Sequence, residues 1–336
     1  RGLGDVYKRQ TETCLIYLNF WKREKMNKKS MPTAVAGSLM FMGLTVLFLT
    51  LGGLTQLLNI YFGIFFTEAI ILGLVTYLVC VFKKYYVKET LALRMPYEGT
   101  LWKAFFISLL SYPVIVFING LYLTGLSKFM TLPSDMGVPL PETFPMFLVS
   151  VIMFAVLPGV FEELVFRGFL FRAFDRYKPV ARIFITATLF AIFHYNPINI
   201  VGPFLMGLTF GYLRYRSDSL LPSIIGHTTN NSIAMVIGYI ANKAGNLDLD
   251  AAGDPDMANV EAMLGDSKVL VAAFGLIVIA LLAYMVYKLL KSFPDYREKT
   301  TLVIKPEKNE KLFTWIMFIF GFIMLASAFV IVMKKF

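Results

Sequence analysis

The sequence predicts an all-α membrane protein, a polytopic bundle of eight to nine transmembrane helices. Hydrophobic residues make up 57% of the 336 residues and charged residues 16%, whereas a soluble domain carries about 25% charged residues. Nine apolar runs recur along the chain, most of them near the ~20 residues that a helix needs to cross a bilayer. Basic residues fall between these runs in a pattern that alternates as expected for successive spans.

Each run is an apolar stretch bounded by charged or turn-forming residues. The first follows Lys28 and Lys29, and it is too long, and lacks the small-residue cleavage site, for a signal peptide, so we expect a retained helix. The second ends at Lys83, and the third ends before Lys128. The fifth and sixth are short and are the reason for a count of eight to nine. In order, the runs are 33–54, 57–82, 101–126, 144–172, 180–196, 198–213, 219–241, 269–290 and 312–333.

The net charge of +10 is a signal of topology. With a cytoplasmic N-terminus and nine spans, 27 of the 32 Lys and Arg residues fall on the cytoplasmic side. We therefore predict a protein integral to the cell (plasma) membrane with its N-terminus in the cytoplasm. The same distribution argues against a nucleic-acid partner and leaves the lipid bilayer as the expected surroundings.

The runs divide the chain into five parts. Residues 1–31 form a cytoplasmic N-terminal segment, of which residues 1–10 are expected to be non-native sequence ahead of a start at Met26 or Met31. The other four parts are the N-terminal transmembrane helices, a core that carries charged motifs, an acidic outer loop, and C-terminal transmembrane helices with a cytoplasmic linker. They span residues 32–143, 144–241, 242–268 and 269–336.

Glu162 and Glu163 are adjacent glutamates within the apolar run of the core. A carboxylate at bilayer depth costs about 2.5–3.5 kcal/mol, which favours a functional explanation. Glu163 and Arg167 are related as i, i+4 in the acid-first order, so we expect them to pair on one helix face. Glu162 is rotated about 100° away, with only Phe166 at i+4. An unpaired carboxylate in a water-restricted site is suited to act as a general base, and we assign that role to Glu162.

The chain contains two histidines, His194 and His227, and both lie in apolar runs. His194 follows Phe190 by four residues and His227 precedes Asn231 by four, so each pair shares a helix face. Glu162 lies sixteen residues before the turn near Lys178 and His194 sixteen after it, which puts both at the same depth. His227 reaches a similar depth, so we expect Glu162, His194 and His227 to meet.

This set of side chains predicts hydrolysis by an activated water molecule. No serine in a nucleophile elbow and no cysteine accompanies the motifs, so water is the simplest nucleophile. Glu162 with His194 would activate it, directly or through a bound metal. His227 and Asn231 could donate hydrogen bonds to the oxyanion, or His227 could complete a metal site. Glu68, alone in the second run, could line a substrate cavity, but we favour its interpretation as a hydrogen-bonded glutamate shielded from lipid.

The motifs E-E-x-x-x-R, F-x-x-x-H and H-x-x-x-N occur in that order in successive predicted helices. They read Glu162-Glu163-Leu-Val-Phe-Arg167, then Phe190-Ala-Ile-Phe-His194, then His227-Thr-Thr-Asn-Asn231. Over about residues 144–235 the chain resembles the CPBP family of intramembrane proteases, which includes type II CAAX prenyl endopeptidases and bacterial self-immunity and abortive-infection proteins.

The resemblance implies a catalytic core of about four helices and a metalloendopeptidase-like intramembrane protease. Carried onto this sequence, it gives Glu162 and His194 as water activators and His227 and Asn231 as the oxyanion or metal side, with Glu163, Arg167 and Phe190 in support. It also implies a divalent metal, with zinc as the expected ion, at Glu162, His194 and His227. The sequence has no H-E-x-x-H helix to supply the usual pair of zinc-binding histidines. A mechanism in which Glu162 and His194 activate the water directly needs no metal.

The expected partner is a membrane peptide or lipidated protein, cleaved at the cytoplasmic side or within the bilayer. No residue of this chain predicts that the lipid is a prenyl group. The alternative hypothesis is a non-catalytic membrane binding or immunity protein, or a proton-coupled transporter that uses the Glu and His side chains as a relay. Asn231 favours the protease, because a proton relay needs groups that titrate and an amide does not.

Overall fold

A computed structural model describes residues 31–130, 141–245, 268–295 and 305–335, and all regular structure in these ranges is helical. The expected all-α class is confirmed. The helical segments are α2 (Ala34–Leu47), η2 (Phe48–Gly52), α3 (Gly53–Leu58), α4 (Ile60–Phe65), η3 (Phe66–Leu74), α5 (Val75–Phe82), α6 (Val87–Thr90), α7 (Thr100–Leu126), α8 (Phe144–Val151), η4 (Ile152–Val156), α9 (Leu157–Glu163), η5 (Leu164–Leu170), α10 (Phe171–Ala173), α11 (Pro179–Phe193), α12 (Val201–Ser217), α13 (Leu221–Gly245), α15 (Lys268–Lys291) and α16 (Lys308–Lys335).

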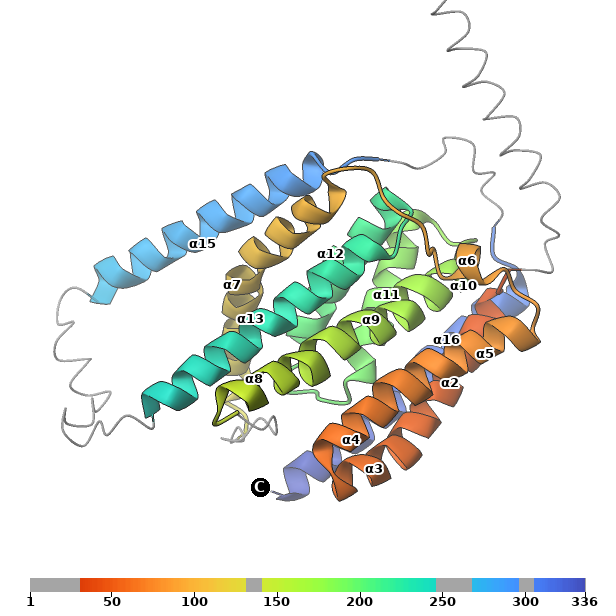
Figure 1. The fold of residues 1–336 in the computed structure, drawn as a ribbon, viewed down its shortest axis with the longest axis horizontal. Coiled ribbons are helices and arrows are strands. Elements are labelled where there is room, and N and C mark those ends of the chain that lie inside the picture. Colours follow the sequence, from red (N-terminus) through yellow and green to blue (C-terminus); the bar gives the residue numbers. More distant parts are fainter. Residues whose placement is uncertain (1–30, 131–140, 246–267, 296–304, 336) are drawn as a thin grey trace, which may run out of the picture.

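Within the described ranges, six helical stretches are long and apolar enough to cross a membrane, and the η segments are π-helical turns within three of them. Helices α11, α12 and α13 lie among these stretches in the bundle (Figure 1). The expected count of eight to nine spans stays a prediction. The six stretches are Ala34–Leu58, Ile60–Phe82, Thr100–Leu126, Phe144–Ala173, Ala272–Lys291 and Lys308–Val330.

The central helices α9, α11, α12 and α13 are flanked on opposite sides by the rest of the chain (Figure 1). Helix α7 packs against α12 and α13 and carries α15 on its outer side. The N-terminal helices and α16 cover the other side, where α16 contacts α2 and α11. The two C-terminal helices therefore lie far apart, one on each flank of the core.

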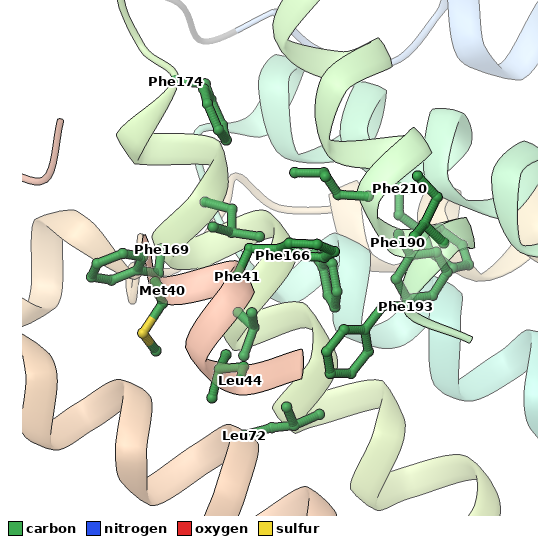
Figure 2. Close-up of a cluster of buried hydrophobic side chains, with 14 of the residues drawn as sticks. Met40, Phe41, Leu44, Leu72, Phe166, Phe169, Phe174, Phe190, Phe193 and Phe210 are labelled. Atoms are coloured by element: carbon green, nitrogen blue, oxygen red, sulfur yellow. The ribbon is translucent and has the colours of Figure 1, made fainter. Parts of the chain in front are cut away.

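The core is rich in phenylalanine. Figure 2 shows Phe41 of α2, Phe166 of η5, and Phe190 and Phe193 of α11 converging from three helices. The Phe166 and Phe190 rings are 5.2 Å apart in an edge-to-face arrangement, which is favourable for aromatic pairs. This cluster packs the predicted glutamate helix and the predicted histidine helix against each other, as expected of a hairpin.

Two helix ends differ from the expected ones. The second run was expected from residue 57, but Asn59 interrupts it with extended backbone and caps α4 through a hydrogen bond from Phe62 N to its Oδ1. The fifth run was expected to continue to residue 196, but α11 ends at Phe193 because Tyr195 adopts a left-handed conformation with φ of 47°.

Basic residues of the predicted cytoplasmic segments form ion pairs and hydrogen bonds with other segments at the same end of the bundle. Arg94 pairs with Asp218 at 2.7 Å, and Lys103 Nζ donates to the Ser292 carbonyl at 2.9 Å. Arg176 Nη1 donates to Glu307 at 2.8 Å, and this hydrogen bond raises the pKa of Arg176. Four segments predicted on the same side of the membrane thus meet, although which side this is stays a prediction.

The division of the chain into five parts also stays a prediction. Two expectations lie outside the described residues, namely the non-native start within residues 1–10 and most of the acidic loop 242–268.

Candidate active site

Glu163 lies at the end of α9 and binds two cationic or polar partners. Its Oε1 accepts hydrogen bonds from Arg167 Nη1 at 2.7 Å and from His227 Nδ1 at 2.9 Å. The side chains of Glu163 and Arg167 are fully buried. The expected i, i+4 ion pair of Glu163 and Arg167 therefore forms. Glu163 also bonds His227 of α13, a contact that residue spacing along one helix did not reveal.

Arg167 is held on every side by protein. Its Nη2 donates to the Gly207 carbonyl of α12 at 3.3 Å, and its guanidinium lies 4.3 Å from the centre of the Phe190 ring. Stacking on an aromatic face stabilises a desolvated guanidinium. Arg167 thus neutralises Glu163 and joins η5, α11 and α12.

His227 lies between the two glutamates. Its Nε2 is 3.8 Å from Glu162 Oε2, while its Nδ1 is bonded to Glu163. An ionised carboxylate only accepts hydrogen bonds, so the contact with Glu163 places the proton of a neutral imidazole on Nδ1 and leaves Nε2 free toward Glu162. Two carboxylates from one helix therefore act on opposite nitrogens of a single ring.

Two phenylalanines fix the plane of that ring. Phe210 stacks on His227 with centroids 5.4 Å apart and an interplanar angle of 21°, and Phe190 meets it edge-on at 5.6 Å. Figure 2 shows Phe190 and Phe210 side by side at this place. Phe190, expected as packing beneath the site, contacts both histidines, because its ring is also 4.8 Å from that of His194.

Glu162 is less enclosed than Glu163, with 13% of its side chain exposed. Its Oε2 is buried and has no hydrogen-bond partner among the described residues. The expectation that Glu162 lacks a partner on its own helix is consistent with this environment.

His194 directly follows α11 and is exposed at the protein surface. Its Nδ1 bonds the Phe190 carbonyl at 2.8 Å, which directs Nε2 away from its own helix. The ring of Phe190 lies against both His194 and His227, and the expected meeting of His194 with Glu162 stays a prediction.

Tyr195 anchors the chain directly after His194. Its hydroxyl donates to Thr45 Oγ1 of α2 at 2.8 Å, and its ring lies 5.7 Å from that of Phe48. A left-handed backbone is uncommon for an aromatic residue and persists only where the surroundings hold it. The sequence analysis missed both Tyr195 and Thr45, and no motif marks either residue.

Asn231 lies one turn beyond His227 and contacts a different part of the core. Its Nδ2 donates to the Phe154 carbonyl in η4 at 3.1 Å. The neighbouring Asn230 points toward α12, where its Nδ2 is 3.2 Å from the Met206 sulfur. The structure thus joins Asn231 to the helical stretch that carries the two glutamates.

A close approach of two helices brings Glu162 and His227 together. A Cβ placed on Gly159 of α9 would lie 2.3 Å from Thr228 Oγ1 of α13. Any larger residue would force these helices apart, since real Cβ atoms do not approach so closely. Glu162 is one turn from Gly159 and His227 adjoins Thr228, so the glycine sets their separation.

The metal site expected at Glu162, His194 and His227 is not tested by the structure, which carries no ligands. Within the part of the chain that the structure describes, no three His, Cys, Asp or Glu side chains are grouped so that they could hold a metal ion. One nitrogen of each histidine is already hydrogen-bonded. The divalent metal stays a prediction, and no step below is routed through it.

Comparison with known proteins finds a family that resembles the core. Residues 144–233 match a family described as type II CAAX prenyl endopeptidase Rce1-like. The matched segment begins with α8 and contains both glutamates, Arg167, Phe190, both histidines and Asn231. No curated protein and no solved structure matches the chain. The match favours a protease over the transport hypothesis.

Proposed function

We propose that the protein is an intramembrane endopeptidase that hydrolyses a peptide bond of a membrane-associated or lipidated peptide, since residues 144–233 match the family described as type II CAAX prenyl endopeptidase Rce1-like. The observation that supports this most is the array Arg167–Glu163–His227–Glu162, which joins a fixed ion pair to a free carboxylate through one imidazole. Such an array is suited to moving a proton at one defined place.

Glu162 is the proposed general base. The 3.8 Å between Glu162 Oε2 and His227 Nε2 is too long for a good hydrogen bond, so Glu162 Oε2 can accept a hydrogen bond from a water molecule that lies beside the ring. As the water oxygen attacks the peptide carbonyl carbon, its proton passes to Glu162. The same proton then reaches the leaving amine as the tetrahedral intermediate collapses.

His227 is the proposed partner for the developing oxyanion. Glu163 and Arg167 keep its Nδ1 proton and its ring orientation, as a buried carboxylate does for a catalytic imidazole. In its protonated form His227 Nε2 donates a hydrogen bond toward the charge that forms on the carbonyl oxygen. Asn231 retains a second Nδ2 hydrogen beside its bond to Phe154 and is the second proposed donor.

His194 is the proposed second contact for the water or the substrate. Its Nδ1 is engaged by the Phe190 carbonyl, so Nε2 is the nitrogen available for chemistry. Because His194 is exposed, it lies where a substrate from the membrane or the cytoplasmic face would arrive. The proposed location is the plasma membrane, with the N-terminus in the cytoplasm.

The test is cleavage of a fluorogenic membrane peptide by purified wild type and by the variant Glu162→Gln. We expect cleavage by the wild type and a loss of about a hundredfold or more in the variant, because proton transfer contributes roughly 10²–10⁴-fold. The exposed Glu142→Gln is the matched control. Undiminished cleavage by Glu162→Gln would contradict the base assignment, and metal analysis of wild type and His194→Ala tests the expected divalent metal.

A further inference from the structure

Glu68 is a buried carboxylate that lies outside the segment matching the family. It lies in η3, in the second apolar stretch, and only 4% of the residue is exposed. Its Oε2 has no hydrogen-bond partner among the described residues, which differs from the hydrogen-bonded state expected from the sequence. Leaving a buried carboxylate oxygen unpaired is costly, so a missing partner is the simplest explanation.

The helix that carries Glu68 packs against the helix that carries Glu162. A Cβ on Gly73 of η3 would lie 2.5 Å from Phe161 Cδ1 and 3.4 Å from the Glu68 carbonyl oxygen. Gly73 follows Glu68 by five residues, one turn of a π-helix, so both share the face toward α9. Phe161 immediately precedes Glu162, and the charges of Glu68 and Glu162 interact.

Among the described residues, three buried glutamate oxygens on the helices of this site have no hydrogen-bond partner, Oε2 of Glu68, Glu162 and Glu163, and of these three carboxylates only that of Glu163 is paired with an arginine. Glu68 Oε2 and Glu162 Oε2 are both buried and both without a hydrogen-bond partner in the described part of the chain. Ionised carboxylates offer only acceptors, so they cannot satisfy each other. A water molecule has two hydrogens to donate, and a buried water typically bonds two to four polar groups.

We propose that Glu68 and Glu162 together hold the water molecule that attacks the peptide bond. This inference rests on the proposed endopeptidase function and adds a residue from the N-terminal helices to the site. The water donates one hydrogen to each carboxylate, which directs an oxygen lone pair toward the substrate carbonyl. When the new C–O bond forms, the O–H bond toward Glu162 breaks, its proton moves to Glu162, and the carbonyl π electrons move to the oxyanion. The hydrogen bonded to Glu68 stays on the oxygen.

The first test is the variant Glu68→Gln, which keeps the side-chain shape but replaces one acceptor with an amide donor. We expect kcat to fall about tenfold to a hundredfold, as for a misplaced reactant, with KM changed less than twofold. The thermal midpoint should stay level or rise, because an unpaired buried charge has been removed. A structural role alone would instead lower the midpoint and leave kcat unchanged.

A shorter carboxylate separates orientation from charge. Glu68→Asp retains two acceptor oxygens, so it should keep more activity than Glu68→Gln. The control is again Glu142→Gln, which changes an exposed glutamate and should leave kcat unchanged. Full activity in Glu68→Gln beside an inactive Glu162→Gln would overturn the role of Glu68 and leave the proposed function standing.

A second test does not depend on cleavage. Thermal midpoints of Glu68→Gln, Glu162→Gln and the double variant form a cycle that reports whether the two carboxylates share surroundings. We expect the double variant to differ clearly from the sum of the single changes. Strict additivity would overturn the inference, even if no peptide substrate were found. The absence of wild-type cleavage with a non-additive cycle would refute the proposed function, and with it the attack on a peptide bond, while the shared surroundings of Glu68 and Glu162 would stand.

Discussion

The two sides of the His227 ring are built in contrasting ways. On the Nδ1 side, Glu163 Oε1 accepts two hydrogen bonds and is neutralised by a fully buried Arg167. On the Nε2 side, Glu162 Oε2 lies 3.8 Å from the ring and has no hydrogen-bond partner within the described residues. The Nδ1 side contains a buried arginine–glutamate ion pair, and the Nε2 side has no such pair among the described residues.

The two sides differ in whether the glutamate beside the ring is paired with a cation. Each side has a carboxylate oxygen without a hydrogen-bond partner among the described residues, Oε2 of Glu163 and Oε2 of Glu162, so the difference lies in the cation: Glu163 is paired with the buried Arg167, and Glu162 has no salt bridge to an arginine or lysine in the described part of the chain. Adjacent glutamates in the sequence have these different partners because successive residues of a helix point about 100° apart. The Nδ1 side orients the ring, and the Nε2 side is where the ring can act.

Removing the Arg167 cation from the Nδ1 side of His227 should have the largest effect on stability. Arg167→Met leaves Glu163 buried without its cation, and removing one partner of a buried ion pair costs about 3–5 kcal/mol. Unfolding of purified protein in detergent measures this loss. Arg172→Met is the matched control, since its pair with Asp175 is partly exposed and should contribute only about 0–1 kcal/mol. Equal losses in the two variants would refute the contrast.

Moving apart the helices that carry Glu162 and His227 should have the next largest effect. Gly159→Ala places a methyl group against Thr228 and separates the helices of Glu162 and His227. We expect a loss of about 1–3 kcal/mol in stability and about a hundredfold in kcat, as for a small displacement of catalytic groups. Gly43→Ala in α2 meets no atom within 4 Å and should retain activity. Wild-type kcat in Gly159→Ala would show that this helix contact does not set the site.

Much of the Nδ1 side could be predicted from the sequence. Composition gave the helical membrane class, and the i, i+4 rule gave the pair Glu163–Arg167, because both depend on contacts within one helix. The depth argument placed His227 near Glu162 correctly, since rise per residue is nearly constant. The contact between His227 and Glu163 was not predicted, because it depends on how two helices are rotated about their own axes.

Local departures from α-helical backbone limited the prediction of the surroundings of Glu162 and His194. The π-helical segments η4 and η5 flank α9 and alter which faces the glutamates present, and no sequence pattern in this chain signalled them. The left-handed Tyr195 ended α11 earlier than its apolar run suggested. Glu68 was recognised as unusual, but its proximity to Glu162 follows from packing between residues that are distant in sequence.

Loosening the anchor of His194 should have the smallest effect, and it tests whether the N-terminal helices support the site. Tyr195→Phe removes the hydroxyl that bonds Thr45, a fully buried residue, so we expect a loss of about 1 kcal/mol. Since His194 adjoins Tyr195, kcat should also fall several-fold with little change in KM. Steady-state cleavage and unfolding in detergent measure the two effects.

The interaction between Tyr195 and Thr45 can be isolated from other consequences of the substitution. Thr45→Val removes the other half of the hydrogen bond, so the double variant should lose less than the sum of the single losses. Tyr212→Phe is the matched control, because its hydroxyl bonds the Leu290 carbonyl on the flank of the bundle that carries α15. It should lose similar stability without losing kcat. If both tyrosine variants lose kcat equally, the effect is general loosening of the bundle, and His194 does not depend on α2 for its position.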